Sequence, residues 1–239
     1  MSAESAGIVT LSKPRTVAID GPVASGKSSV GRLLAQRWGH VFLDTGMMYR
    51  AMTWWALRHG IAPDDAAALA RLASEARITI EPTAEVPRVM IDGEDATPHM
   101  RDREVEANVS MVSAVPGVRS ALVREQRRIA EQQPVVMAGR DIGTVVLPDA
   151  DLKVYLDASV ETRARRRHGE LDRGSRTLEE VREELTARDR LDSERSVSPL
   201  RPADDAIILD VDHLGLAEVV ERIAAFAGCE GDGTAEATS

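Results

Sequence analysis

The sequence predicts a doubly wound α/β fold built on a five-stranded parallel sheet. Three observations lead to this prediction: short apolar runs alternate with helical patterns, nearly every residue of those runs is apolar, and a G-x-x-x-x-G-K-[ST] motif follows the first run. Continuous apolar character suits strands that helices cover on both faces of a parallel sheet. The alternation of strand and helix is typical of doubly wound α/β domains.

The expected elements follow in chain order. Short runs rich in Val, Ile or Leu predict strands at Thr16–Ile19, Val41–Leu43, Val135–Ala138, Leu152–Leu156 and Ala206–Leu209. Apolar residues at steps of three and four predict helices at Lys27–Trp38, Met47–His59, Pro116–Gln132, Thr177–Glu194 and Leu216–Phe226. We expect these elements to form one core from residues 15–44, 115–160 and 196–228.

Two stretches interrupt the alternation. Residues 45–114 are too long for one crossover, and within them Ile78–Ile80 and Arg88–Ile91, followed by Asp92-Gly93, predict a small hairpin. Residues 161–195 hold ten Arg and ten Asp or Glu. We expect both stretches to be moving parts.

The composition limits the classes of function. The chain has 239 residues, and its net charge of −9 argues against a nucleic-acid partner. Arg supplies 27 of the 30 basic residues, which fits either recognition of phosphate groups or the codon bias of a GC-rich genome. A single cysteine, Cys229, allows no disulfide within the chain, and no apolar run reaches the length of a membrane span. We expect a cytoplasmic protein, a monomer by default and without a membrane partner, with flexible tails at 1–14 and 229–239.

The glycine-rich motif is the strongest functional signal. It occupies residues 21–28, between the strand Thr16–Ile19 and a helix that ends at Gly39. Glycines let the backbone curl around phosphates, and the N–H groups of the loop face their negative charge. The nucleotide-binding residues are expected to be Gly21, Pro22, Val23, Ala24, Ser25, Gly26, Lys27, Ser28 and Ser29. Lys27 can reach the β- and γ-phosphates and Ser28 can bind Mg²⁺. The alternative is a chance glycine turn before a helix.

Polar residues follow the second and third strands, at the edge where ligands bind in such sheets. Thr45 starts the helix after the second strand, and Tyr49 and Arg50 lie one turn further on, so these side chains could converge on an anion. The alternative is a capped helix with a surface Arg. After the third strand, Arg140 and Asp141 stand between glycines. They form either a second polar cluster or a local ion pair that closes a turn.

The helix expected at Thr177–Glu194 changes character along one face. This face begins with Leu178, Val181 and Leu185. At the same steps it continues with Arg188, Asp192 and Arg195. Because buried charge without a partner is costly, a charged ligand is the simplest account. The alternative is a solvated helix end with pairs such as Glu184–Arg188.

Four motifs in this order carry a family resemblance. They are D-G-P-x-x-S-G-K-S at 20–28, L-D-T-G-x-x-Y-R at 43–50, G-R-D-I-G-T-V-V-x-P-D-A at 139–150 and R-D-x-x-D-x-x-R at 188–195. Over residues 16–226 the chain resembles the bacterial cytidylate kinases, within the P-loop nucleoside monophosphate kinases. The turn Ile91-Asp92-Gly93-Glu94 also looks like that family and unlike adenylate kinases.

The resemblance implies an architecture and an activity. Residues 45–114 would be a monophosphate-binding insert and residues 161–195 a lid, and the enzyme would use ATP and Mg²⁺ to phosphorylate CMP and dCMP in pyrimidine metabolism. The phosphates would be held by Arg50, Arg140, Arg188 and Arg195. The acceptor and its sugar would be lined by Thr45, Tyr49 and Asp192, and the cytosine would be read by Ser110, Arg119 and Asp141. Catalysis would fall to Lys27, Arg140, Arg188 and Arg195, and the lid residues Arg163, Arg165, Arg166 and Arg167 are weaker candidates.

Two rival functions remain open. One is a kinase for another small acceptor, such as UMP or a metabolite alcohol. The other is a nucleotide-dependent switch, for which a GTPase would be expected to carry an N-K-x-D motif. The three lysines, Lys13, Lys27 and Lys153, do not stand in that context.

Overall fold

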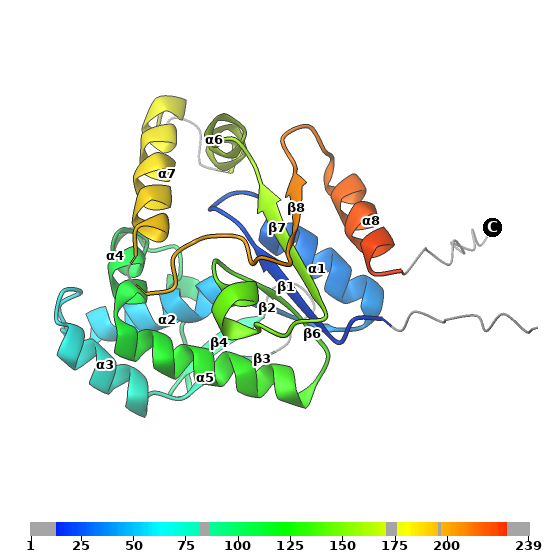
Figure 1. Ribbon diagram of the computed structural model, residues 1–239. Coiled ribbons are helices and arrows are strands. Elements are labelled where there is room, and N and C mark those ends of the chain that lie inside the picture. Colours follow the sequence, from blue (N-terminus) through cyan, green and yellow to red (C-terminus); the bar gives the residue numbers. More distant parts are fainter. Residues whose placement is uncertain (1–12, 82–86, 171–175, 196, 229–239) are drawn as a thin grey trace, which may run out of the picture.

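The computed structural model contains the predicted sheet (Figure 1). It describes residues 13–81, 87–170, 176–195 and 197–228, so Cys229, the tail expected at 229–239 and most of that expected at 1–14 lie outside the described residues. Five strands lie in the order β2-β6-β1-β7-β8, and each neighbouring pair is parallel. Their bounds are Thr16–Asp20 (β1), Val41–Asp44 (β2), Val135–Ala138 (β6), Leu152–Asp157 (β7) and Ile207–Asp210 (β8). The predicted fold class is confirmed.

Helices cover both faces of the sheet and give the molecule two cores (Figure 1). One core lies under α1 (Lys27–Trp38) and α8 (Leu216–Phe226), and the other under α2 (Thr45–Arg58) and α5 (Pro116–Gln132). Successive strand residues point to opposite faces, so Val17 and Ile19 of β1 join the first core while Ala18 joins the second. This two-sided burial explains why the central strands read as continuous apolar runs.

The sheet places three chain segments at one edge. Because the strands are parallel, their carboxyl ends meet there. The glycine-rich loop at residues 21–28, the phosphate loop, follows the central strand β1. Residues 139–141 follow its neighbour β6, and α2 follows β2 on the far side of β6. Segments that are far apart in the sequence therefore surround one space.

Residues 45–114 form a layer of helices with a small antiparallel sheet. After α2 come α3 (Ala66–Glu75), β3 (Ile78–Glu81), β4 (Arg88–Ile91), β5 (Glu94–Asp95) and α4 (Arg103–Ala114). The predicted hairpin is present, with Ile78 opposite Ile91. The structure adds β5, which a two-residue turn joins to β4 through Asp92 and Gly93 at φ of 49° and 83°. Positive φ at both positions is what such a tight hairpin turn requires.

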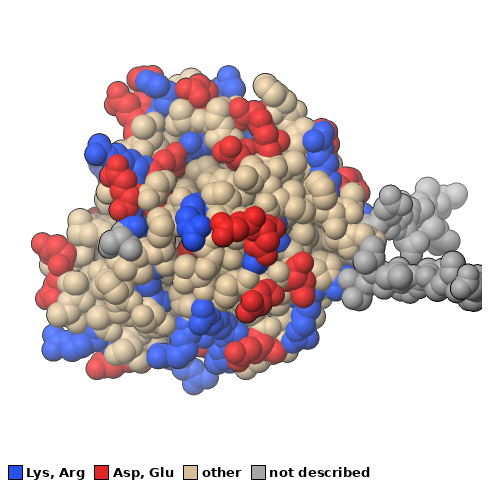
Figure 2. All heavy atoms as spheres, in the orientation of Figure 1, with Lys and Arg blue, Asp and Glu red and all other residues tan. Residues whose placement is uncertain are grey.

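Residues 161–195 contribute most of α6 (Val160–Gly169) and the whole of α7 (Leu178–Ser193). The two helices pack through Ala164, Val181 and Leu185, and Val23 of the phosphate loop packs against this small cluster. The outer surface of α7 carries ion pairs such as Arg182–Glu179 and Arg190–Glu194. Acidic and basic side chains are interspersed over the visible face of the molecule (Figure 2). Exposed pairs of this kind contribute little to stability.

The observed elements differ from the predicted ones in a few places. Helices α3, α4 and α6 were not predicted, because 45–114 and 161–195 were treated only as interruptions. Helix α2 begins at Thr45 rather than Met47, because the Asp44 carboxylate caps it by accepting from the Gly46 N–H. Within the described ranges, the structure contains no helix with both the length and the apolar character needed to span a bilayer.

Candidate active site

The phosphate loop joins β1 to α1 through a tightly curled backbone. Gly21, Ala24 and Gly26 have φ of 147°, 60° and 96°. Glycine adopts positive φ values readily, whereas for a residue with a Cβ atom they are unfavourable. At Gly21 the backbone also passes so close to the Leu156 carbonyl oxygen that a Cβ would not fit. The glycines at both fixed positions of the motif are therefore required by the loop itself.

Lys27 lies buried at the start of α1, with its ammonium folded back over the loop. Its Nζ donates to the Pro22 carbonyl oxygen at 2.5 Å and to the Ser25 Oγ at 3.2 Å. Burial, followed by the nearby Arg140 guanidinium, lowers the pKa of Lys27 well below its usual range. An anion bound in the loop would remove this penalty by compensating the buried charge.

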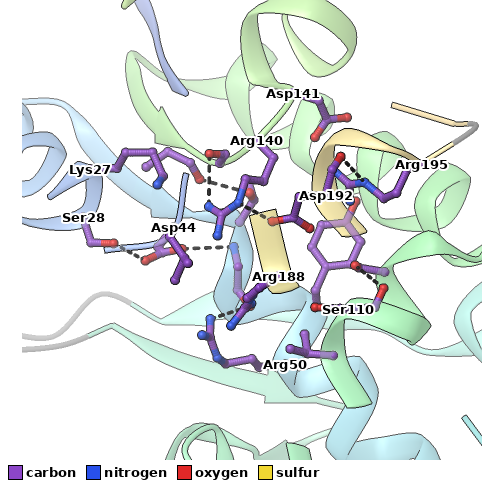
Figure 3. A pocket seen from close by; sticks show the side chains of 18 of the residues that line it. Lys27, Ser28, Asp44, Arg50, Ser110, Arg140, Asp141, Arg188, Asp192 and Arg195 are labelled. Carbon is purple, nitrogen blue, oxygen red and sulfur yellow. Dashed lines mark hydrogen bonds and ion pairs between the residues drawn. The ribbon is translucent and has the colours of Figure 1, made fainter. Parts of the chain in front are cut away.

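Ser28 and Asp44 bring oxygen ligands to the mouth of the loop. The Ser28 hydroxyl donates to Asp44 Oδ2 at 2.6 Å (Figure 3). Asp44 ends β2, so this contact joins the start of α1 to the end of β2. Carboxylate and hydroxyl oxygens are the donors that Mg²⁺ prefers. The residues present therefore fit a magnesium ion that arrives with a nucleotide.

All ten residues assigned to the acceptor line one cavity (Figure 3). They come from α2, α4, α5, α7 and the segments that follow β6 and α7. They are Thr45, Tyr49, Arg50, Ser110, Arg119, Arg140, Asp141, Arg188, Asp192 and Arg195. Lys27 and Ser28 line the same cavity, and an adjoining cavity is lined by residues 23–29 and the helices α6 and α7. Gly21 and Pro22 line neither of these two cavities.

The cavity holds more guanidinium donors than nearby carboxylates can satisfy. Arg140 Nε donates to Asp192 Oδ2 at 2.9 Å. Among the described residues, however, the buried Arg188 Nε and Arg195 Nη2 have no hydrogen-bond partner. Burial, followed by Arg140, lowers the pKa of Arg188 to about 10, and burial also lowers the pKa of Arg50 and of Arg195. Such a cluster is unfavourable by itself and suited to an anion.

The far end of the cavity is built around a buried ion pair. Arg119 on α5 donates to Asp141, and the two side chains are 4% and 6% exposed. Arg119 also donates to the Ser113 carbonyl oxygen at 3.2 Å, and its Cζ lies 5.4 Å from the centre of the Tyr49 ring. Burial raises the pKa of the Tyr49 hydroxyl to about 12, so it stays protonated. This end of the cavity therefore presents fixed donors and a fixed carboxylate.

The structure decides among the alternatives left open for these segments. Arg140 and Asp141 do not form a local pair, since Arg140 contacts Asp192 on α7 and Asp141 contacts Arg119 on α5. On α7, Glu184 accepts from Arg176 rather than from Arg188.

The remaining alternative concerned the start of α2. The Thr45 hydroxyl does not cap the helix there but donates to the Ala138 carbonyl oxygen at 3.0 Å. It thereby ties α2 to the end of β6. The guanidinium of Arg50 lies in the cavity rather than on the surface.

The four weaker lid candidates separate into two groups. Arg166 and Arg167 line the cavity beside the phosphate loop. Arg163 and Arg165 line neither cavity, and Arg163 instead holds α6 in place by donating to the Val23 and Ala158 carbonyl oxygens and to Asp189.

Several acidic residues near the cavities were not among the predicted site residues, among them Asp20, Asp44 and Glu106. Asp20 and Asp44 end the strands β1 and β2, a position that could have marked them. Glu106 on α4 pairs with Arg167 on α6 at 2.8 Å, which links the two inserted stretches across the cavity beside the phosphate loop. Nothing local in the sequence around Glu106 indicated that contact.

The sheet and the phosphate loop define a P-loop α/β protein, and the arginine-rich cavity beside the loop is suited to an anion. Comparison with known proteins narrows the class. Residues 17–228 match the family model described as cytidylate kinase. The chain belongs to the cytidylate kinase family.

Individual relatives agree with this assignment. The cytidylate kinase of Streptococcus sanguinis (strain SK36) is 49% identical over 210 residues, which cover 87% of this chain and 93% of that protein. The bifunctional pantoate ligase/cytidylate kinase of Synechococcus sp. (strain JA-3-3Ab) is 51% identical over 212 residues. That alignment covers 87% of this chain and 39% of the bifunctional protein, so the chain spans about two fifths of such relatives.

Solved structures were also compared. A shikimate kinase from Acinetobacter baumannii in complex with shikimate has a TM-score of 0.45 at 17% identity, over 90% of this chain and 93% of that one. A likeness at this level is too distant to carry a functional conclusion.

Proposed function

We propose that this chain transfers the γ-phosphoryl group of ATP to CMP and dCMP, giving ADP with CDP or dCDP. The observation that carries the proposal is the acceptor cavity itself. It joins the phosphate loop at one end to the buried Arg119–Asp141 pair at the other, with unpartnered arginine nitrogens between them. The family to which the chain belongs supports the same reaction.

The reaction needs no covalent intermediate with the protein. An oxygen of the acceptor phosphate forms a bond to the γ-phosphorus as the bond from that phosphorus to the β–γ bridging oxygen breaks, and ADP leaves with that oxygen. Charge in the transition state spreads over phosphate oxygens, so positioned cations stabilise it. Lys27, Arg140, Arg188 and Arg195, which all line the cavity, would supply these cations. The acceptor is already an anion, so no strong general base is needed.

The metal role falls to the pair at the mouth of the loop. Ser28, with Asp44 beside it at 2.6 Å, would hold Mg²⁺ bound to the nucleotide phosphates. When bound, the ion would neutralise charge on the β- and γ-phosphate oxygens. The protein's own part is to keep the oxygens of Ser28 and Asp44 in place. The Asp44 carboxylate is held by the Gly46 N–H, which donates to it as the helix cap.

Selection of cytosine would depend on the fixed pair at the far end. Asp141 can accept from the exocyclic amine of cytosine, while Arg119 and Ser110 can donate to N3 and O2. Uracil would present a carbonyl oxygen to the Asp141 carboxylate, and a buried mismatch of this kind costs about 1–3 kcal/mol. Tyr49, Thr45 and Asp192 would line the phosphate and sugar between the two ends.

The test is a coupled assay of ADP release with CMP, dCMP, UMP and AMP as acceptors. We expect CMP and dCMP to have kcat/KM values at least about tenfold above that of UMP. Equal or greater turnover with UMP or AMP would show that CMP and dCMP are not the preferred acceptors. ADP release that does not depend on any acceptor would favour the nucleotide-dependent switch instead.

A further inference from the structure

Asp20 is a buried carboxylate next to both substrate cavities, although it lines neither of them. It ends β1 and directly precedes Gly21 of the phosphate loop. Its Oδ1 accepts from the Ile142 N–H at 2.8 Å and its Oδ2 from the Gly143 N–H at 2.7 Å. One side chain therefore connects the strand that carries the donor loop to a segment 122 residues further along the chain.

The segment that Asp20 holds is the one that carries the acceptor residues. After β6, the turn presents Arg140 and Asp141 to the cavity and then enters a short π-helix, η2 (Ile142–Val146). At the far end of η2, Arg127 of α5 donates to the carbonyl oxygens of Val145 and Val146 at 2.6 and 2.8 Å. The segment is thus fixed by a carboxylate at its start and by a guanidinium at its end. A π-helix is rare and is found mostly at functional sites.

Within the described part of the chain, the Asp20 carboxylate accepts no hydrogen bond besides these two. It is 4% exposed, and the charged groups that act on it are Asp141 on the turn and Lys27 at the start of α1. Burial raises the pKa of Asp20 to about 6 against the effect of its two backbone hydrogen bonds. At neutral pH the carboxylate is therefore mostly ionised and accepts both bonds.

We propose that Asp20 is a positioning residue for the acceptor base: its carboxylate fixes the turn that carries Arg140 and Asp141 against the phosphate-loop strand. The inference rests on the proposed function and deepens it. Asp141 can discriminate cytosine from uracil only while its own backbone is held in place. Without the two bonds from Asp20, the turn is free to shift relative to Arg119, and the base loses its fixed carboxylate.

The decisive variant is Asp20→Asn, which keeps the shape of the side chain but turns one accepting oxygen into a donor that faces an N–H. We expect the ratio of kcat/KM for CMP over UMP to fall about tenfold, because one hydrogen bond that holds the turn becomes a repulsive contact. KM for CMP should rise by a similar factor. The Kd for ATP should stay the same or decrease, because the change removes a negative charge near Lys27.

Asp151→Asn is the matched control. Asp151 is also an aspartate whose carboxylate accepts two hydrogen bonds, in this case at the other end of β1, from the N–H and the hydroxyl of Thr16 at 2.8 and 2.9 Å. This variant should leave both the base ratio and the Kd for ATP unchanged. Gly143→Ala tests the same junction with the carboxylate in place. Its Cβ would lie 3.2 Å from Lys153 Cδ and 3.4 Å from Asp20 Oδ2, and we expect a smaller fall of the base ratio, about twofold.

An unchanged CMP-to-UMP ratio in folded Asp20→Asn would overturn the inference, as would equal losses for CMP and ATP. A purely structural role for Asp20 predicts the second of these results, since general loosening affects both substrates. A failure of the proposed function is distinguishable from both results, because the unmodified protein itself would then show no CMP-dependent release of ADP.

Discussion

Replacing Arg188 with Met should make the substrate-free protein more stable while it removes most of the activity. The buried Nε of Arg188 has no hydrogen-bond partner among the described residues, and burial lowers the pKa of this guanidinium from its ordinary value to about 10. Since the folded-state pKa is the lower one, the protonated form is disfavoured in the fold, and the full penalty applies at neutral pH. At 1.36 kcal/mol per pKa unit, the shift corresponds to about 3 kcal/mol at most.

The measured gain should be smaller, because water that enters the cavity screens part of the charge. We expect Arg188→Met to raise the free energy of unfolding by about 1–2 kcal/mol, since Met keeps the packing of the aliphatic stem. For a chain of this size that corresponds to a rise in Tm of about 5 °C. Turnover should fall about 100- to 1000-fold, as it does when one preorganised donor to a transition-state oxyanion is removed.

Thermal unfolding without nucleotides and the coupled ADP assay measure the two effects. Arg190→Met is the matched control, because Arg190 lies on the same helix and its side chain is 75% exposed. Among the described residues it pairs with Glu194 alone, in an exposed i, i+4 contact. We expect that variant to change stability by less than about 0.5 kcal/mol and to keep its turnover. A lower Tm for Arg188→Met, or turnover close to that of the unmodified protein, would refute the reasoning.

Three further predictions address the donor loop, the base and the metal. Lys27→Ala should lower turnover by at least about 1000-fold with an unchanged circular dichroism spectrum, and near-normal turnover would contradict the role of the loop. Asp141→Asn should damage use of CMP far more than it weakens ATP binding, and an equal loss of both would contradict base recognition. The Asn variant is preferred to Ala, because leaving Arg119 without its buried partner costs about 3–5 kcal/mol in stability. Removal of Mg²⁺ with EDTA should lower turnover at least about 100-fold and added Mg²⁺ should restore it, whereas activity in EDTA would contradict the role of Ser28.

The sequence predicted the core sheet well because its strands are buried on both faces. Nearly continuous apolar character is a signal that solvent-facing strands do not give, and β6 showed it at every residue. The sequence also contains a signal for α3, because Asp65 precedes a run rich in Ala and Leu. Its side chain caps the helix by accepting from the Ala68 N–H. Gly117 then lets α5 approach α3 closely at Ala70, a packing that no local pattern reveals.

The sequence grouped side chains that line one cavity, but their mutual contacts could not be predicted. Motifs at strand ends located the side chains, since parallel strands bring their carboxyl ends together. The pairs that organise the cavity join residues far apart in the chain: Arg119 is 22 residues from Asp141, and Arg140 is 52 residues from Asp192. Such contacts depend on the order of strands in the sheet and on where α5 and α7 cross it. The order β2-β6-β1 could not be read from local patterns.

Helix α7 shows why the acceptor site and the core obey different rules. Val181 and Leu185 are buried against α6, as an apolar stripe requires. One turn further on, the same face places the half-buried Arg188 and the buried Asp192 at the cavity, where an apolar residue would be more favourable for the empty protein. When the inward face of a helix changes from apolar to charged residues at one end, binding rather than folding determines the side chains there. If this reasoning is right, the apo protein tolerates a strained cluster of cations because the phosphates of two substrates relieve it, and ligand-induced stabilisation should be largest when both are bound.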